Sequence, residues 1–424
     1  MRILVISNFL PPRMIGGFEL ACYNISKGLR ARGHEVLILT TPTEKEPPEN
    51  QDFVDRVLTM RWFPKVPVTD PTLLRFLRRE SLVSQQANTQ IVLDRIRRFR
   101  PDHVLFFNLV GIGGLALVDM VDATGIPWTM NLGDRVPSAL VEGIPRNVRE
   151  IYNVHPEGDL FRRGWSSIVS QTLIDEIRRE GISLGKNVQI IPRGVIVRDV
   201  KRTRPYRENG VTKFVSAGAL LPHKGIDLVL EAAARLDAEG EFEFFIDIYG
   251  DGRRAVYEKM ANDLGVSHRV AFHGSVSQRE VIEANAGADS FLFPTWEREP
   301  GASAPIEAGV AGSVTIMTGN CGPAERLVHG VHCLKIERTV DSLVAAMRQV
   351  GKGEIDLETM GKAAQKLAAG DLSFDVSIQR LEKLLAREIT EPRPNRVDDR
   401  TLDLEVLDKD ERSVRALYEL LERR

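Results

Sequence analysis

Cysteine is scarce in this chain, with only three residues among 424. Cys22, Cys321 and Cys333 show no CxxC spacing and no nearby cluster, which argues against a metal site built on them. We interpret them as isolated reduced thiols, the usual state of cysteine in a cytosolic protein. A cytoplasmic location is the expectation that follows.

Long apolar runs and an excess of charge of one sign are also missing. No stretch approaches the roughly 18–20 apolar residues that a membrane-spanning helix needs. The short apolar run at the N-terminus is interrupted at Ser7 and has no small-residue cleavage site before Pro11, so it is not typical of a signal peptide. With 57 basic and 59 acidic side chains, the chain lacks the basic excess of proteins that hold nucleic acids by their phosphates. No nucleic-acid partner is expected.

What is present is typical of a soluble globular protein, with 43% hydrophobic and 27% charged residues. Short apolar segments rich in β-branched residues alternate with helical patterns such as residues 18–32 and a long one from about 72 to 100. This alternation predicts an α/β fold with parallel sheets. Strands are predicted at residues 3–8, 35–40, 57–62, 104–110, 128–132, 167–170 and 188–191, and again at 214–217, 242–249, 270–272, 290–294, 314–317 and 333–336.

The two series of strands predict two doubly wound domains. We expect an N-terminal domain at residues 1–194, a linker at 195–212 and a C-terminal domain at 213–373. A crossover helix at 374–389 and a charged extension at 390–424 complete the chain. Ligands of such sheets bind outside the carboxyl ends of the strands, so the cleft between the two domains is the expected site.

The charged extension ends in an amphipathic pattern. Val414, Leu417, Tyr418 and Leu421 follow the i, i+3, i+4, i+7 spacing of one helical face. This spacing predicts a helix docked on the protein behind a flexible connector.

The first loop of interest contains Gly16 and Gly17, between the strand at 3–8 and the helix at 18–32. Adjacent glycines allow close backbone approach, and a helix N-terminus offers unpaired N–H groups to an anion. A simple tight turn is the alternative interpretation.

Two further loops follow strands of the second series. Gly218 and Lys224 follow the strand at 214–217, where the lysine is a point charge suited to phosphate; the alternative is a surface lysine. Glu299 lies after the strand at 290–294, and Glu307 lies in the first turns of the next helix. Two carboxylates around small residues suit the recognition of hydroxyls, with backbone N–H groups for phosphate. The alternative is a solvated pair of glutamates.

In this order and at these separations, the loops resemble the retaining GT-B glycosyltransferases of family 4, also called glycosyl transferases group 1. Glu299 and Glu307 fit the E-x7-E spacing of that family. The other matching segments are Pro11-Pro12 with Gly16-Gly17-Phe18-Glu19, residues 32–36, Gly218 with Lys224-Gly225-Ile226-Asp227, residues 249–252 and residues 270–274. The resemblance spans about residues 1–388.

The resemblance implies the GT-B architecture, two Rossmann-like domains facing an interdomain cleft, with the acceptor on the N-terminal side and the nucleotide sugar on the C-terminal side. It implies transfer of a hexose from a nucleotide-diphosphate sugar to a carbohydrate, lipid-linked or small-molecule acceptor, with retention of configuration and with neither cofactor nor metal. The departing phosphate serves as base. Glu299 and Lys224 are implied as catalytic residues. Donor-binding residues are implied at Gly16, Gly17, Gly218, Lys224, Gly301, Ala302, Ser303 and Glu307.

Within this pattern, the diphosphate is assigned to Gly16, Gly17 and Lys224. The sugar hydroxyls are assigned to Glu299 and the ribose diol to Glu307.

The sequence departs from the family pattern at a few positions. Ala219 stands where the family usually has an arginine, with Arg193, His223 or Arg298 as candidates to replace that charge. The strand ends near Phe107 and Gly133 lack histidines that many relatives carry. A relative that binds nucleotide sugars, or acts as a scaffold, without efficient catalysis is therefore the alternative function.

Three other features have competing interpretations. Residues 111–116 mimic a G-x-G-x-x-A dinucleotide fingerprint. Asp408-Lys409-Asp410 mimics a metal-binding D-x-D motif but is interpreted as a solvated face of the extension. The arginine-rich helix predicted at 72–100 leaves open a weak peripheral contact with anionic membranes.

Overall fold

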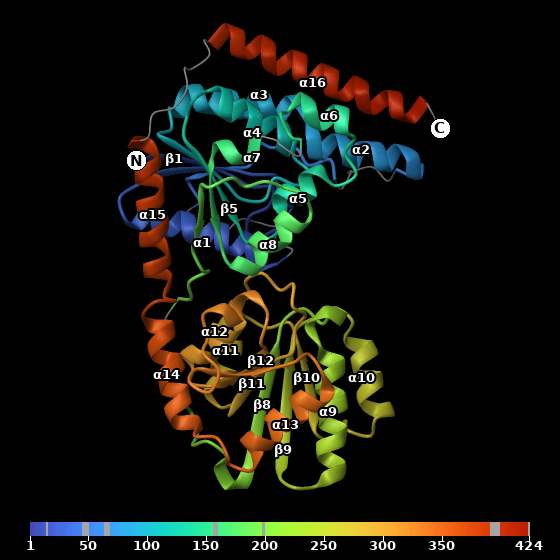
Figure 1. Ribbon diagram of the computed structural model, residues 1–424, viewed down its shortest axis with the longest axis vertical. Helices are drawn as coiled ribbons and strands as arrows, with labels where there is room; N and C mark the ends of the chain where they lie inside the picture. Colours follow the sequence, from blue (N-terminus) through green and yellow to red (C-terminus); the bar gives the residue numbers. More distant parts are fainter. Residues whose placement is uncertain are drawn as a thin grey trace. The chain divides into compact units, whose positions relative to one another are not determined.

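The computed structural model describes residues 1–13, 16–44, 51–62, 68–155, 160–196, 200–390 and 399–422. The chain forms two compact units, coloured by sequence in Figure 1. The first unit comprises Met1–Val169, Leu173–Ile191 and Ile378–Arg424, and the second comprises Ser170–Thr172 and Pro192–Ser377.

The first unit is built on a parallel sheet of seven strands in the order β3-β2-β1-β4-β5-β6-β7. The order reverses between β1 and β4, which is the arrangement of a doubly wound fold. The strands are β1 (Arg2–Ile6), β2 (Glu35–Leu39), β3 (Val54–Asp55), β4 (His103–Phe106), β5 (Trp128–Leu132), β6 (Trp165–Ile168) and β7 (Val188–Ile190).

Helices cover this sheet because its central strands β1 and β4 are apolar after their first residues, Arg2 and His103, and must be buried on both faces. Helix α1 packs beside β2, and α3 packs beside β1 and α4. The helices are α1 (Gly17–Ala31), α2 (Pro71–Val83), α3 (Gln86–Phe99), α4 (Gly114–Ala123), α5 (Val136–Val141), α6 (Arg146–Ile151) and α7 (Leu160–Arg163). Two more, α8 (Gln171–Arg179) and α15 (Phe374–Thr390), begin in the second unit and continue in the first.

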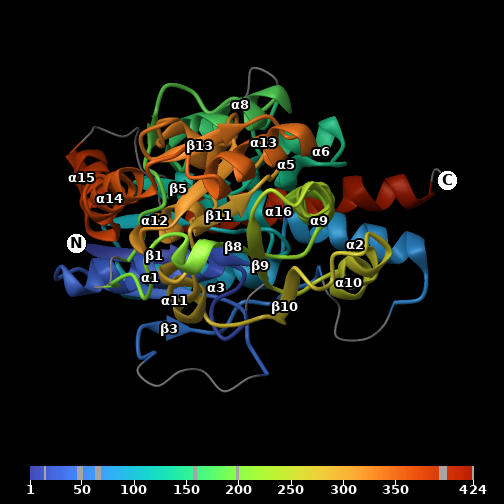
Figure 2. The same ribbon diagram turned by 90° about the horizontal axis from the view of Figure 1, so that it is seen from below.

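The second unit has a parallel sheet of six strands in the order β10-β9-β8-β11-β12-β13. Helices α9, α10 and α13 form one packed group and α11, α12 and α14 another, as Figures 1 and 2 show. The strands are β8 (Val211–Ala217), β9 (Glu243–Tyr249), β10 (Val270–Gly274), β11 (Ser290–Phe293), β12 (Val314–Thr318) and β13 (Cys333–Ile336). The helices are α9 (Ile226–Glu239), α10 (Arg254–Asp263), α11 (Gln278–Ala286), α12 (Ala304–Val310), α13 (Val340–Gly351) and α14 (Leu357–Ala369), with short 3₁₀ turns η1 (Glu208–Gly210), η2 (Pro222–Lys224) and η3 (Gly322–Glu325). The predicted α/β class with two doubly wound sheets is confirmed.

The strand predicted at 57–62 is wrong. Its backbone bonds to loops and to a side chain instead of a neighbouring strand: Leu58 N donates to Thr40 O at 3.0 Å, and Thr59 N donates to Asn88 Oδ1 at 2.8 Å. Only Val54–Asp55 pairs with β2 in this region.

The single helix predicted at 72–100 is two helices, α2 and α3. The break lies at Ser84, whose extended backbone (ψ 144°) ends α2 before α3 begins at Gln86. The Gln85 side chain there donates to the carbonyl of Gly111 at 2.6 Å. This contact with the next loop explains the break better than any local helix-breaking residue.

The dinucleotide-like glycines at 111–114 have a structural explanation. A side chain on Gly113 would lie 2.4 Å from the backbone nitrogen of Gln85, and one on Gly111 would lie 2.5 Å from the sulfur of Met60. Both glycines have positive φ angles, 86° at Gly111 and 85° at Gly113. They allow the chain to pack against itself, which weakens the cofactor interpretation.

The extension forms α16 (Asp399–Glu422), which packs across α2, α3, α4 and α6 (Figure 1). Its buried face comprises Leu402, Val406, Asp410, Ser413 and Leu417, whereas Tyr418 is 54% exposed. The amphipathic face predicted at 414–421 is therefore only partly correct, since Leu417 is buried but Tyr418 is not.

Asp410 is buried, so the solvated interpretation of the D-x-D segment is wrong at this residue. Its Oδ1 accepts hydrogen bonds from Ser84 Oγ and from Tyr152 OH, the latter at 3.2 Å. Lys409 pairs with Asp119 at 2.7 Å. Burial raises the pKa of both carboxyl groups, Asp119 and Asp410. These contacts of Lys409 and Asp410 hold α16 against the rest of the first unit.

Replacing Asp410 by asparagine is expected to raise the free energy of unfolding relative to that of wild type progressively as the pH rises. Burial raises the pKa of Asp410 above its ordinary value of 3.8, so the folded protein binds this proton more tightly than the unfolded chain. That stabilisation is complete below about pH 4 and is lost as the pH rises through the raised pKa. Asparagine keeps the Oδ1 acceptor and has no charge to bury.

The measurement is urea unfolding of both proteins at several values between about pH 5 and pH 8. The charge of Asp119 also raises the pKa of Asp410, so the difference between the two proteins reports the coupled titration of this pair of carboxyl groups. A difference in the free energy of unfolding that stays constant over this range contradicts the prediction.

Candidate functional site

The strand order of the second sheet reverses between β8 and β11. Loops that leave the carboxyl ends of two such strands diverge to opposite sides and leave room for a ligand between them. The loop after β8 carries Lys224 and the loop after β11 carries Glu299. The fold therefore brings together two residues that lie 75 positions apart in the sequence.

Close backbone packing fixes the loop after β8. Gly225 has a φ of 76°, and a side chain there would lie 2.2 Å from the carbonyl oxygen of Pro294, just beyond β11. The carbonyl of His223 also accepts a hydrogen bond from Trp296 N at 2.9 Å. Lys224 is consequently held at the start of α9 beside the loop after β11.

Lys224 Nζ forms an ion pair with Glu299 Oε2. Glu299 is 7% exposed, and its carbonyl accepts a hydrogen bond from Gly322 N at 2.8 Å. The ammonium also lies 5.9 Å from the ring of Phe293. Low exposure strengthens the attraction between the two charges, and the pair places a cation and an acceptor of hydroxyl protons side by side.

Glu307 lies on α12 and is 8% exposed. The amide of Gln278, the first residue of α11, donates to Glu307 Oε1 at 2.7 Å. Gln278 was not among the predicted site residues, because an exposed glutamine near a helix start carries no signal of function. Gln278 lies next to Glu307 because α11 packs against α12.

The segment Gly301–Ser303 lies between the two glutamates and is partly exposed. Within the described ranges, the backbone N–H groups of Gly301, Ala302 and Ser303 donate no hydrogen bond. Gly218 lies open at the end of β8, with no atom within 4 Å of the place where a side chain would begin. The N–H groups of residues 301–303 remain available to a ligand, whereas Gly218 N already donates to Tyr249 O at 3.0 Å.

Of the three candidates to replace the charge absent at Ala219, the structure argues against His223. Burial, together with the neighbouring charge of Lys224, lowers the pKa of His223, so its imidazole is neutral at pH 7. Arg298 lies over the ring of Trp296 at 5.3 Å. Arg193 lies two residues before Val195, which pairs with Ser373.

Buried thiols do not supply a nucleophile to this site. Burial raises the pKa of Cys321 to about 12, and the nearby carboxylate of Glu299 adds to the rise. The thiol therefore stays protonated at neutral pH and is a poor nucleophile.

Gly16 and Gly17 belong to the first unit, at the start of α1. Gly16 N donates to Glu19 Oε2 at 2.9 Å, so a carboxylate of the same helix already occupies this N–H group. Phe107, which follows β4, is buried and its ring lies 5.9 Å from that of Phe18. Phe107 supplies no group for proton transfer.

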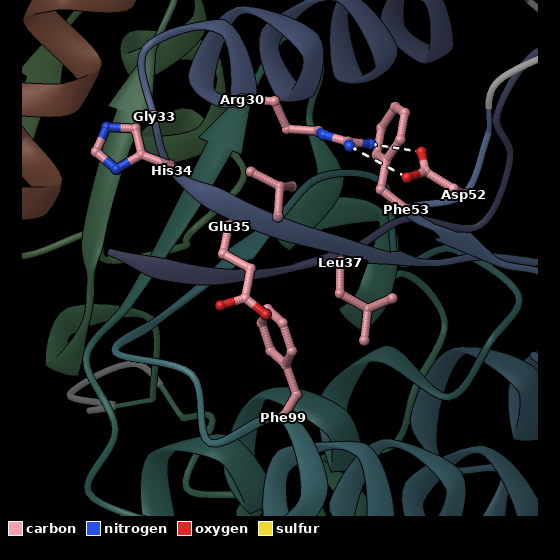
Figure 3. A pocket seen from close by; sticks show the side chains of 9 residues that line it. Arg30, Gly33, His34, Glu35, Leu37, Asp52, Phe53 and Phe99 are labelled. Carbon is pink, nitrogen blue, oxygen red and sulfur yellow. Dashed lines mark hydrogen bonds and ion pairs between the residues drawn. The ribbon is translucent and has the colours of Figure 1, made fainter.

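A hollow of about 580 Å³ lies in the first unit beside the amino end of β2. Its polar side chains already have partners: Arg30 pairs with Asp52 at 2.9 Å, and the His34 ring forms a hydrogen bond with Glu382 at 2.8 Å. Figure 3 shows the Arg30 guanidinium against the ring of Phe53. The hollow lies at the opposite edge of the sheet from the carboxyl ends, so it is a poor candidate for the ligand site.

The described part of the chain holds no group of three or more histidine, cysteine, aspartate or glutamate residues arranged to bind a metal. Among the same residues, no helix is long and apolar enough to cross a bilayer.

Both halves of the chain match models of glycosyltransferase domains. The model of glycosyl transferases group 1 matches residues 198–367, and the model of a glycosyl transferase 4-like domain matches residues 16–180. Together with the fold, these matches define a glycosyltransferase of GT-B architecture. The chain belongs to the group 1 glycosyltransferases.

Known proteins agree with this assignment. The GDP-mannose-dependent alpha-(1-6)-phosphatidylinositol monomannoside mannosyltransferase of Mycobacterium tuberculosis is 26% identical over 218 residues, which cover 47% of this chain and 56% of the relative. The match thus spans little more than half of that relative. A glycosyltransferase from Rickettsia africae superposes with a TM-score of 0.70 at 15% identity, over 92% of this chain and 99% of the other. The Anabaena protein HepE, solved with UDP and glucose, superposes with a TM-score of 0.64 at 17% identity, over 91% of this chain and 100% of the other.

Proposed function

We propose that the protein transfers a hexose from a nucleotide-diphosphate sugar to an acceptor hydroxyl, with retention of configuration and without a metal. The observation that carries the proposal is the Lys224–Glu299 ion pair at the point where the strand order of the second sheet reverses. The HepE structure with UDP and glucose supports a nucleotide-sugar donor. The acceptor is a carbohydrate, a lipid-linked sugar or a small molecule.

In this proposal, Lys224 stabilises the charge that develops on the departing diphosphate, as fixed cations do in transferase sites. Glu299 accepts hydrogen bonds from the hydroxyls of the donor sugar, and Glu307 accepts those of the ribose. The N–H groups of Gly301, Ala302 and Ser303 face the phosphates. A departing phosphate oxygen takes the proton of the acceptor, so no side-chain base is required.

The proposed roles of Gly16 and Gly17 stay predictions. A diphosphate that reached the start of α1 would have to share this N–H group with the carboxylate of Glu19, and the two anions would repel each other. We therefore assign the larger part of diphosphate binding to Lys224.

A weak peripheral membrane contact also stays a prediction. Helix α16 packs over α2 and α3, and its Asp403 pairs with Arg97 at 2.8 Å. Arg75 and Arg78 on α2 and Arg98 on α3 are exposed and remain available to anionic lipid.

The second candidate is a relative that binds nucleotide sugars without efficient transfer. The neutral His223 beside Ala219 favours it, because the diphosphate then meets fewer positive charges. Loss of one charge-assisted contact weakens binding by about 10–100-fold.

The protein is expected to transfer sugar from one of a panel of UDP-, GDP- and ADP-sugars, equally well in EDTA and in Mg²⁺. The negative charge of the leaving group is met by Lys224 and by backbone N–H groups, so no divalent cation is needed. Release of the nucleoside diphosphate measures turnover, and nuclear magnetic resonance of the product gives its anomeric configuration. Abolition by EDTA with recovery in Mg²⁺ or Mn²⁺ contradicts the metal-independent proposal. Binding without turnover on any acceptor favours the second candidate.

A further inference from the structure

Glu307 is a buried carboxylate with few polar partners. Its side chain accepts one hydrogen bond, from Gln278 Nε2, and no cation contacts it among the described residues. Burial of a charge that is neither paired nor fully hydrogen-bonded is costly. A buried carboxylate with unused acceptor positions can accept hydrogen bonds from a ligand.

The backbone of Gln278 is firmly held even though its side chain is exposed. Ser277 caps α11 by accepting from Glu280 N at 3.3 Å, and Glu280 Oε2 accepts in return from Ser277 N at 2.8 Å. This reciprocal cap fixes the first turn of the helix. The amide of Gln278 therefore reaches Glu307 from a rigid starting point.

A single amide donor can orient a carboxylate without using up its capacity. Each carboxylate oxygen has about two acceptor positions, so Oε1 can hold Gln278 and one further donor. Oε2 has no partner in the described part of the chain. The carboxylate is thus fixed in orientation and still able to accept two hydroxyl protons from neighbouring carbons.

We propose that Gln278 is a positioning residue that orients Glu307 toward the 2′,3′-diol of the donor nucleotide and thereby favours ribonucleotides over 2′-deoxyribonucleotides. The inference rests on the proposed function, which assigns the ribose to Glu307. It adds a residue of a different helix, which touches the carboxylate and not the reacting atoms.

The test is calorimetric titration of the full chain with whichever of UDP, GDP and ADP binds most tightly, and with its 2′-deoxy analogue. Gln278→Ala is expected to weaken binding of the ribonucleotide about 10-fold, the size of one hydrogen bond to a charged group. Binding of the deoxy analogue, which lacks one of the two hydroxyls, should weaken clearly less in this variant. Arg279→Ala is the matched control, since this exposed neighbour pairs only within α11, with Glu283 at 2.7 Å, and should change neither affinity.

Gln278→Glu gives a second readout that a merely structural role would not move. At about pH 8 two carboxylates face each other and repel, so affinity relative to wild type should fall at least 10-fold. At lower pH the two facing carboxylates come to share one proton, and a protonated carboxyl group at position 278 can donate to Glu307 as the amide does. The affinity of the variant should therefore approach that of wild type at low pH. Titration of the phosphate itself affects both proteins, so it is removed by comparing them at the same pH.

The outcomes separate the inference from the proposed function. If Glu307→Ala weakens ribonucleotide binding while Gln278→Ala does not, the positioning role is overturned and the role of Glu307 stands. If Gln278→Ala weakens binding of the ribonucleotide and of its deoxy analogue equally, the positioning role is also overturned. If Glu307→Ala leaves the affinity unchanged, the assignment of the ribose to Glu307 fails first. Equal melting temperatures of the Gln278→Ala and Arg279→Ala variants exclude misfolding as the cause of any loss.

Discussion

Replacing Glu299 by glutamine is expected to lower the rate of sugar transfer at least about 100-fold, which corresponds to about 2.7 kcal/mol of transition-state stabilisation. The sugar ring gains positive charge as its bond to the diphosphate breaks, and a carboxylate on its hydroxyls responds to that charge more strongly than an amide does. Binding of the free nucleoside diphosphate should stay intact or become tighter. The glutamine releases Lys224 from its ion pair, and the freed ammonium can turn to the phosphates.

Turnover and calorimetric titration of the diphosphate measure the two effects separately. Glu297→Gln is the control, because Glu297 lies in the same loop but is exposed, and it should behave as wild type. Adding Lys224→Ala to Glu299→Gln should abolish any gain in nucleotide affinity, since coupled residues do not act additively. A Glu299→Gln variant that loses nucleotide affinity and keeps its rate of transfer would reverse the assigned roles.

The sequence was sufficient to place Lys224 and Glu299 after strands, because short β-branched segments between helical patterns mark a buried parallel sheet. It did not predict that the two side chains form an ion pair. That contact depends on β8 and β11 being neighbours and on Gly225 approaching Pro294. Both features arise from tertiary packing between segments far apart in the chain.

The wrong predictions of secondary structure and burial also result from packing between segments far apart in the chain. Ser84 ends a helix whose local sequence continues to favour helix, because Gln85 bonds to the loop at Gly111. The buried face of α16 was misplaced because the polar residues Asp410 and Ser413, outside the predicted face, are buried. Their partner Tyr152 lies more than 250 residues away, so no pattern within the helix reveals it. Gln278 was missed because its proposed role depends on a hydrogen bond to Glu307, which lies on a different helix.

The segment at residues 195–212 is predicted as a linker because it is rich in arginine and polar residues. In the structure its Arg204, whose side chain is 9% exposed, pairs with Asp289, which is fully buried just before β11. Asp289 also accepts hydrogen bonds from Arg207 N and Lys213 N, both at 2.7 Å. One carboxylate therefore ties this segment and the start of β8 to the centre of the second unit.

Replacing Asp289 by alanine is expected to reduce the stability of the second unit by about 3–5 kcal/mol, the cost of leaving one partner of a buried ion pair without its counter-charge. Two backbone N–H groups lose their acceptor at the same time, which adds to the cost. For a unit of this size the melting temperature should fall by roughly 10 °C. Differential scanning calorimetry and urea unfolding of the full chain measure the change.

Asp341→Ala is the matched control. Asp341 also pairs with an arginine, Arg235, but its side chain is 82% exposed, and pairs of this kind contribute between zero and about 1 kcal/mol. In an Arg204→Met background, Asp289→Ala should cost clearly less, because no buried guanidinium is then left alone. A loss below about 1 kcal/mol for Asp289→Ala in the wild-type background would mean that water or another carboxylate reaches Arg204, and that this segment is not held by the Arg204–Asp289 pair.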